Sequence, residues 1–139
     1  MTRSLSIERE LGQIGPAADK MRAWLDDVLD EYGVASVELS FVEALTNSIL
    51  YGPSDCPSPI GVFLEISDTQ VALEIEDGSP PMPSLFEGAG AQQLDFDLDD
   101  IENLDEGGRG LSLIVISMDE VNFRKVEDHV RLRMVRYRN

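Results

Sequence analysis

The feature that most restricts the fold of this chain of 139 residues is a set of short segments in which apolar and polar residues alternate. Two pairs of these segments are separated by short polar stretches, at Ser67–Gln70 and at Glu127-Asp128. A period of two that is interrupted by a polar turn predicts a β-hairpin, so two hairpins and one further strand are expected. The alternating segments are residues 4–9, 60–66, 71–76, 121–126 and 129–137.

Two long segments between the first strand and the first hairpin carry apolar residues at helical spacing. The first helix is predicted to begin at Pro16 and to stop at Gly33. Its apolar stripe consists of Met21, Trp24, Leu25, Val28 and Tyr32. The second helix is predicted to have Ser36 as its N-cap and to end at Gly52-Pro53. Its apolar stripe consists of Val37, Phe41, Leu45 and Ile49.

A third helix is predicted after the glycine-rich residues 107–110, with a buried side made of Leu111, Ile114, Val115 and Met118. The order strand, helix, helix, hairpin, loop, helix, hairpin predicts an α/β two-layer sandwich, in which helices cover one face of a mostly antiparallel sheet. A doubly wound sheet would require strands that alternate with helices. The chain has no internal repeat and no interdomain linker, so residues 1–139 are expected to form one domain.

The balance of charge excludes some partners. The chain has 11 Lys and Arg residues against 27 Asp and Glu residues, which gives a net charge of −16. Direct binding of nucleic acid is therefore not expected, because neutralising its phosphates requires clustered basic residues. The apolar runs are short and no apolar leader is present, which argues against membrane insertion or export and for a cytoplasmic protein. With one cysteine and one histidine, the chain also lacks the usual ligands of a zinc site.

The last alternating segment is rich in arginine, with Arg131, Arg133, Arg136 and Arg138. Charged side chains on an edge strand oppose pairing with the strands of other molecules. These arginines are expected to face solvent and to limit aggregation at a sheet edge. The alternative is that they form a patch for a partner.

Glu43 and Asn47 are the first residues that suggest chemistry. They are four residues apart on the predicted second helix, so they share a face that differs from the apolar stripe. Such a pair is most often a solvated surface pair. In the functional interpretation, Asn47 offers its amide oxygen to Mg²⁺, and Glu43 orients or deprotonates an attacking hydroxyl group.

Asp77 and Gly78 follow the second strand of the first hairpin, within the segment Asp-Gly-Ser-Pro-Pro. A segment of this composition is most often only a turn. In the functional interpretation, the carboxylate accepts a hydrogen bond from the exocyclic amine of adenine, and the glycine lets the ring approach the backbone.

Gly107-Gly108-Arg109-Gly110 precedes Leu111 and the predicted third helix. The glycines are either a flexible connection or a phosphate site, because the free N–H groups of a helix N-terminus bind anions and Arg109 would add a charged donor. Residues 82–106 lack a strong period and end in an acidic run, so they are predicted to be a mobile loop with at most a short helix. Neither GxxxxGK[ST] nor a GxGxxG after the first strand is present.

Taken together, three segments resemble the N, first-glycine and second-glycine boxes of the histidine-kinase-like (GHKL) ATPase superfamily. They are EALTNSILYG at 43–52, IEDGSPP at 75–81 and GGRGLSLIVISMDEV at 107–121. The nearest likeness is to the anti-sigma-factor serine kinases of the bacterial partner-switching type. The resemblance extends from about residue 5 to residue 137.

The resemblance implies a Bergerat-type ATP-binding fold and a protein-serine kinase that uses ATP and Mg²⁺. Glu43 would be the catalytic or water-positioning carboxylate, Asn47 the magnesium ligand, and residues 82–106 the ATP lid. Asp77 would bind the adenine amine, and Gly78 would lie against the ring. The nucleotide-binding set would be Asp77, Gly78, Gly107, Gly108, Arg109, Gly110 and Leu111.

The partners are also implied by the resemblance. Members of this family phosphorylate a serine of a small antagonist protein of the anti-anti-sigma (STAS) type, bind a sigma factor or similar regulator, and usually act as homodimers. Two departures weaken what the resemblance implies about activity: Tyr51 stands where many members have His, and Ser79 stands in the first-glycine box where a second Gly or another residue may occur. Neither removes a cation or base ligand. A more serious departure is that Asp105 and Glu106 precede the glycine turn where some relatives have Arg, which keeps open the alternative of a nucleotide-binding interaction module with weak or no kinase activity. A sensor-kinase catalytic domain is a weaker alternative, because no dimerisation helix pair or phosphoacceptor histidine segment is visible.

Overall fold

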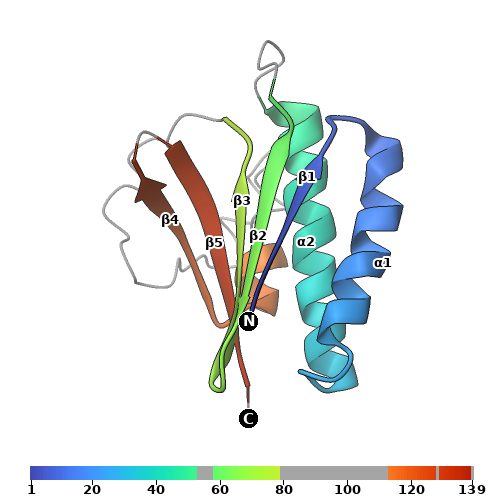
Figure 1. Cartoon of the computed structure of the whole chain (residues 1–139), viewed down its shortest axis with the longest axis vertical. Helices are drawn as coiled ribbons and strands as arrows, with labels where there is room; N and C mark the ends of the chain where they lie inside the picture. Colours follow the sequence, from blue (N-terminus) through green and yellow to red (C-terminus); the bar gives the residue numbers. More distant parts are fainter. Residues whose placement is uncertain (53–57, 79–112, 128, 139) are drawn as a thin grey trace, which may run out of the picture.

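Within the residues that the structure describes, five strands form one antiparallel sheet in the order β1-β2-β3-β5-β4 (Figure 1). The computed structural model describes residues 1–52, 58–78, 113–127 and 129–138. Residues 113–117 are also helical. The other elements are β1 (Thr2–Ile7), the 3₁₀ helix η1 (Leu11–Gln13), α1 (Ile14–Leu25), α2 (Glu31–Tyr51), β2 (Ile60–Ile66), β3 (Gln70–Glu76), β4 (Glu120–Val126) and β5 (His129–Tyr137).

Both predicted hairpins are confirmed, because β2 pairs with β3 and β4 pairs with β5 in antiparallel register. The alternation places one apolar row across the inner strands. Leu64 lies opposite Leu73, and Leu73 lies opposite Met134, which in turn faces Val121. All four side chains are buried, so this row forms the sheet side of the core.

Helices α1 and α2 and the helical residues 113–117 lie on the same face of the sheet, which confirms the predicted two-layer α/β sandwich (Figure 1). The apolar stripe of α2 points at the sheet, and Val37, Phe41 and Leu45 are 0% exposed. Burial of each such side chain stabilises the fold by about 1.5–3 kcal/mol. No helix among the described residues combines the length and apolar content that a membrane span needs.

The predicted boundary between the first two helices is wrong. Helix α1 already ends at Leu25, and Gly33 is not its stop but a residue of the first turn of α2. The cap is Asp30, whose carboxylate accepts a hydrogen bond of 2.7 Å from the Gly33 backbone N–H. A Cβ atom at position 33 would come within 3.1 Å of the Asp30 Oδ1 atom, so glycine leaves room for the cap.

The shifted boundary changes the role of two further residues. Ser36, predicted to be the N-cap, lies inside α2 and is buried. Tyr32, assigned to the first apolar stripe, belongs to α2 and is 72% exposed. The other end of α2 is as predicted, with Gly52 as its C-cap. A Cβ atom on Gly52 would collide with the Ser48 carbonyl oxygen.

The arginine-rich strand is not at the edge of the sheet, which corrects the prediction made for it. Strand β5 lies between β3 and β4. On the face away from the helices, Arg133 and Arg124 donate hydrogen bonds of 2.7 and 3.1 Å to Glu74, which is 6% exposed. Arg131 contacts Glu74 and Glu76 as well, and its guanidinium lies 3.8 Å from the centre of the Phe63 ring. The arginines therefore compensate a buried carboxylate.

We expect the Asp30 cap to contribute measurably to stability. Asp30→Ala leaves the Gly33 N–H without this acceptor, and loss of an N-cap of this type costs about 1 kcal/mol. Urea unfolding of the wild type and the variant measures the difference. Asp27→Ala, which removes another exposed acid from the same connection, is the control. Equal unfolding free energies for the two variants would contradict the role of Asp30.

Candidate functional site

Helix α2 carries two of the residues that the sequence singled out. Glu43 and Asn47 are one turn apart and half-buried, on a face of the helix that differs from the one formed by Val37, Phe41 and Leu45. Docking of the apolar face on the sheet fixes the rotation of α2. It therefore also fixes the direction in which the Glu43 and Asn47 side chains leave the helix.

The end of β3 positions the other described pair. The strand stops at Glu76, and Asp77 follows it in a half-buried position. Gly78 has a φ of 81°, a backbone conformation that glycine adopts far more readily than other residues. Strand β3 therefore ends where the Asp-Gly sequence begins, as predicted.

A residue that the sequence analysis did not single out holds Asp77. Arg9, which follows β1, donates a hydrogen bond of 2.6 Å from Nη2 to the Asp77 carbonyl oxygen. Its Nε donates another, of 3.0 Å, to the Ser58 carbonyl oxygen. Nothing in the sequence around Arg9 signals this contact, because it depends on how three strands are paired.

The topology brings the ends of α2 and β3 to the same end of the sheet. Strand β2 begins soon after α2 ends, and Gly61 at the start of β2 lies opposite Glu76 at the end of β3. Figure 1 shows the C-terminal end of α2 and the end of β3 at the same end of the sheet. Helix α2 also packs against β3. The C-terminal end of α2 and the end of β3 therefore lie at the same end of the sheet, with Asn47 about one turn and Glu43 about two turns before the end of α2.

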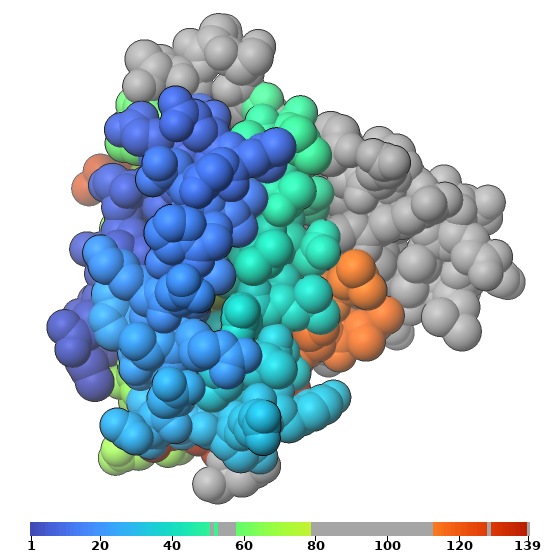
Figure 2. Space-filling view, turned by 90° about the vertical axis from the view of Figure 1, so that its right-hand side faces the viewer, coloured from blue at the N-terminus to red at the C-terminus, as the bar shows by residue number. Residues whose placement is uncertain are grey.

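The remaining predicted site residues, Gly107, Gly108, Arg109, Gly110 and Leu111, lie outside the described residues, as do the predicted lid 82–106 and Asp128. The helix that was predicted after them is described from residue 113. Its predicted buried side is confirmed for Ile114, Val115 and Met118. Figure 2 shows this segment, in orange, beside α2.

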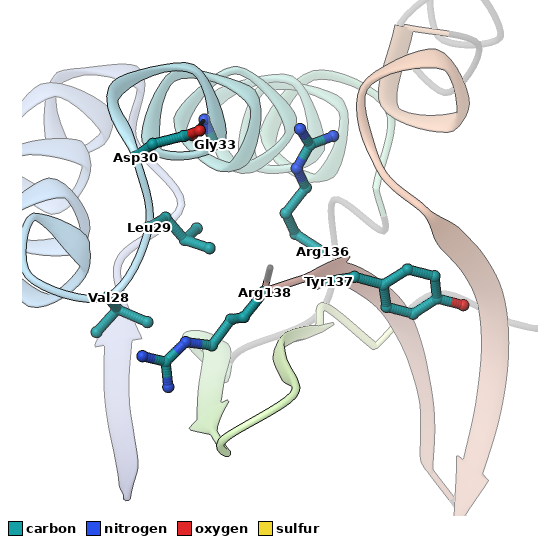
Figure 3. A pocket seen from close by; sticks show the side chains of 7 residues that line it. All are labelled: Val28, Leu29, Asp30, Gly33, Arg136, Tyr137 and Arg138. Carbon is teal, nitrogen blue, oxygen red and sulfur yellow. Dashed lines mark hydrogen bonds between the residues drawn. The ribbon is translucent and has the colours of Figure 1, made fainter.

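A surface pocket lies elsewhere (Figure 3). Gln70 at the start of β3 lies opposite Tyr137, so the pocket is at the far end of β3 from Asp77. The Tyr137 hydroxyl donates a hydrogen bond of 2.6 Å to Glu120, and this bond to the protonated hydroxyl raises the Tyr137 pKa. The pocket is thus separate from the candidate site. It is lined by Val28, Leu29, Asp30, Gly33, Arg136, Tyr137 and Arg138.

Comparison with known proteins bears on the family of the whole chain. A family model described as the histidine kinase-like ATPase domain matches residues 7–136. The match spans nearly the whole chain and includes all the described site residues. A search of curated proteins finds no significant match.

Because Gly78 has a positive φ, we expect Gly78→Ala to lower the unfolding free energy by about 1 kcal/mol, the strain of a left-handed conformation with a Cβ atom. Gly15→Ala is the control, because its effect on the unfolding free energy should have the opposite sign. Gly15 lies in the first turn of α1 with open space around it, so alanine should raise stability by up to about 1 kcal/mol. Urea unfolding measures both, and a stabilising Gly78→Ala would show that the turn does not need glycine.

Proposed function

The chain belongs to the histidine kinase-like ATPase domain family, and from this premise we propose that it is an ATP-dependent protein-serine kinase of the partner-switching type. ATP binding follows from the family. The proposed protein substrate is a small antagonist of the anti-anti-sigma (STAS) type. The protein would also sequester a sigma factor or similar effector and act as a homodimer in the cytoplasm.

The proposal is supported most directly by the conjunction of two motifs at one end of the fold. A carboxylate and an amide lie one turn apart on α2, and an Asp-Gly turn with a positive φ follows β3. Binding of the adenine ring needs a hydrogen-bond acceptor held in place for its amine and a stretch of backbone without a side chain against the ring face. Phosphoryl transfer needs positioned oxygen ligands for the metal ion and an acceptor for the proton of the attacking hydroxyl. The two motifs would supply these groups.

The donor set fits Mg²⁺ bound together with a nucleotide. Among the described residues, no group of three or more His, Cys, Asp or Glu side chains could form a metal site. Mg²⁺ in nucleotide sites typically has only one or two protein ligands, and phosphate and water oxygens complete its shell. Asn47 would hold the ion through its amide oxygen. The ion would neutralise phosphate charge, which an acidic chain cannot do with its own carboxylates.

In the proposed reaction, Glu43 accepts the proton of the acceptor serine hydroxyl as the serine oxygen forms a bond to the γ-phosphorus. The bond from that phosphorus to the oxygen it shares with the β-phosphate breaks, and ADP leaves with the electron pair. Asp77 and Gly78 would hold the adenine, and the glycines 107–110 with Arg109 would bind the phosphates through N–H groups. Catalysis of this kind consists mainly of positioning and charge stabilisation.

Exposed apolar side chains beside Glu43 support a protein substrate. Leu39 and Leu50 are 41% and 52% exposed and lie four residues before and seven after Glu43, so the three share one side of α2. On the neighbouring helical segment Ile116 is 65% exposed. Grouped exposed apolar side chains often mark protein contacts. We propose that the antagonist docks here with basic residues around its own apolar contact, which complements the net charge of −16.

One feature favours the alternative of a nucleotide-gated interaction module. Asp105 and Glu106 precede the glycine turn, where an arginine of some relatives can meet the γ-phosphate. Without a cation there, transfer would be slow unless Arg109 replaces it. ATP bound by the wild type without transfer to any antagonist would support this second function.

The kinase proposal predicts that the protein adds a single phosphate, detected by intact mass, to a purified STAS-type antagonist in the presence of Mg-ATP. We expect Glu43→Ala to retain ATP binding and to lower the transfer rate by about 10²–10⁴-fold, the usual contribution of a general base. Asn47→Ala should lose both phosphate transfer and Mg-dependent ATP binding. Glu38→Ala is the control, because Glu38 is on α2 but pairs with Arg22.

Each of these results tests a different part of the proposal. Wild-type transfer that persists in Glu43→Ala would refute the role of Glu43 as proton acceptor. An ATP-binding function also predicts thermal stabilisation, because a ligand at 100-fold its Kd stabilises the native state by about 2.7 kcal/mol. Absence of any stabilisation by Mg-ATP would argue against nucleotide binding itself.

The docking proposal predicts a separate defect. Leu39→Ser and Ile116→Ser should lower kcat/KM for the antagonist by about tenfold or more, the effect of losing roughly 1.4 kcal/mol of contact energy. Neither should change ATP affinity. Leu11→Ser is the matched control, since Leu11 is also exposed but lies in η1. A wild-type kcat/KM in both variants would place the antagonist elsewhere.

A further inference from the structure

Arg9 connects three segments that are far apart in the sequence. It follows β1 and is half-buried, and its guanidinium donates to the carbonyl oxygens of Ser58 and Asp77. Ser58 precedes β2, and Asp77 follows β3. One side chain therefore joins the end of β1 to the beginning of β2 and the end of β3.

The contact lies where the sheet stops holding its strands together. Ile7, the last residue of β1, lies opposite Ile60, the first residue of β2. Gly61 lies opposite Glu76, the last residue of β3. Asp77 is the residue that follows the last of these pairs. The guanidinium continues the connection by one residue, with charged donors that bind carbonyl oxygens more strongly than neutral ones do.

Holding the Asp77 carbonyl restricts the residue as a whole. The carbonyl direction is set by the backbone dihedral angles of Asp77, and the same backbone sets where its Cα–Cβ bond points. The next residue, Gly78, has a positive φ, and glycine has the widest range of backbone conformations of any residue. Arg9 thus holds the Asp77 carbonyl from the side of β1, next to the strand β3 that precedes it.

We propose that Arg9 is a positioning residue that fixes Asp77 and thereby sets the selectivity of the site for adenine. This inference rests on the proposed function, in which the Asp77 carboxylate accepts a hydrogen bond from the adenine amine. A site built to bond a ligand N–H rejects an analogue that lacks it, because its own polar group is then left unpaired. That rejection requires a fixed acceptor, since a movable carboxylate turns toward water instead.

The test is the ratio of affinities for Mg-ATP and Mg-ITP. Inosine has a carbonyl oxygen in place of the adenine amine, so ITP presents an acceptor to the Asp77 carboxylate. We expect the wild type to prefer ATP, and Arg9→Met to reduce the ATP-to-ITP ratio by about fivefold or more, mainly by weakening ATP, as a loss of about 1 kcal/mol implies. Calorimetric titration measures both affinities. Arg22→Met, which removes an exposed ion pair with Glu38, should leave the ratio unchanged.

A double-mutant cycle separates positioning from a general loss of structure. In an Asp77→Ala background, the adenine acceptor is gone, so Arg9→Met should produce no further change in the ratio. A proportional loss of ATP and ITP affinity in Arg9→Met, with an unchanged ratio, would overturn the inference and leave Arg9 a purely structural role. A further fall of the ratio in the double variant would overturn it as well.

Two further outcomes keep this inference distinct from the proposed function. A wild type that binds neither nucleotide would refute the nucleotide function, and the inference with it. A wild type that binds ATP and ITP with equal affinity would refute the recognition of adenine by Asp77, and the proposed ATP-binding function would still stand. If Arg9→Met does not fold, Arg9→Lys replaces it, because an ammonium group lacks the planar fork that spans two carbonyl oxygens. A full wild-type ratio in Arg9→Lys would then count against the inference.

Discussion

The burial of one face of α2 against the sheet is the contact on which the rest of the structure depends. Val37, Phe41 and Leu45 project from successive turns into the apolar row that includes Leu73 and Met134. A helix of 21 residues with one face fixed in this way cannot rotate without exposing that row. The packing of this face therefore determines which α2 residues remain accessible. It positions Glu43 and Asn47 although neither belongs to the packed face.

The two faces of the sheet are stabilised differently. The inner face uses apolar packing, whereas on the outer face Glu74 is surrounded by Arg124, Arg131 and Arg133. A buried carboxylate is costly unless it is paired, so these residues depend on one another. The charges link β3 to β5 and β4, and Arg131 reaches β2 through Phe63. These ion pairs and the Arg131–Phe63 contact together hold the strands β2, β3, β5 and β4 to one another next to Asp77.

Local patterns predicted the elements, and non-local contacts decided the rest. The hairpins and the end of β3 before Asp77 depend on neighbouring residues and agree with the structure. The boundary at Gly33 was wrong because glycine is typical of helix ends, whereas here it makes space for the Asp30 carboxylate. The alternation of apolar and polar residues along a strand does not determine the order of the strands in a sheet, so the inner position of β5 was not predicted. Arg9 was missed because Ser58 and Asp77 become its neighbours only through strand pairing.

The distribution of basic residues constrains how this chain can bind ATP. Arg124, Arg131 and Arg133 are committed to Glu74 on the sheet face opposite α2, and Arg136 and Arg138 line the pocket at the other end of β3. Five of the 11 basic residues are thus held on the other face of the sheet from α2 or at the other end of β3 from Asp77. In the proposed function, a nucleotide held near α2 by a chain of net charge −16 would be neutralised chiefly by a divalent cation and by backbone N–H groups. The affinity for ATP would therefore depend steeply on Mg²⁺, more than in a site lined by lysines.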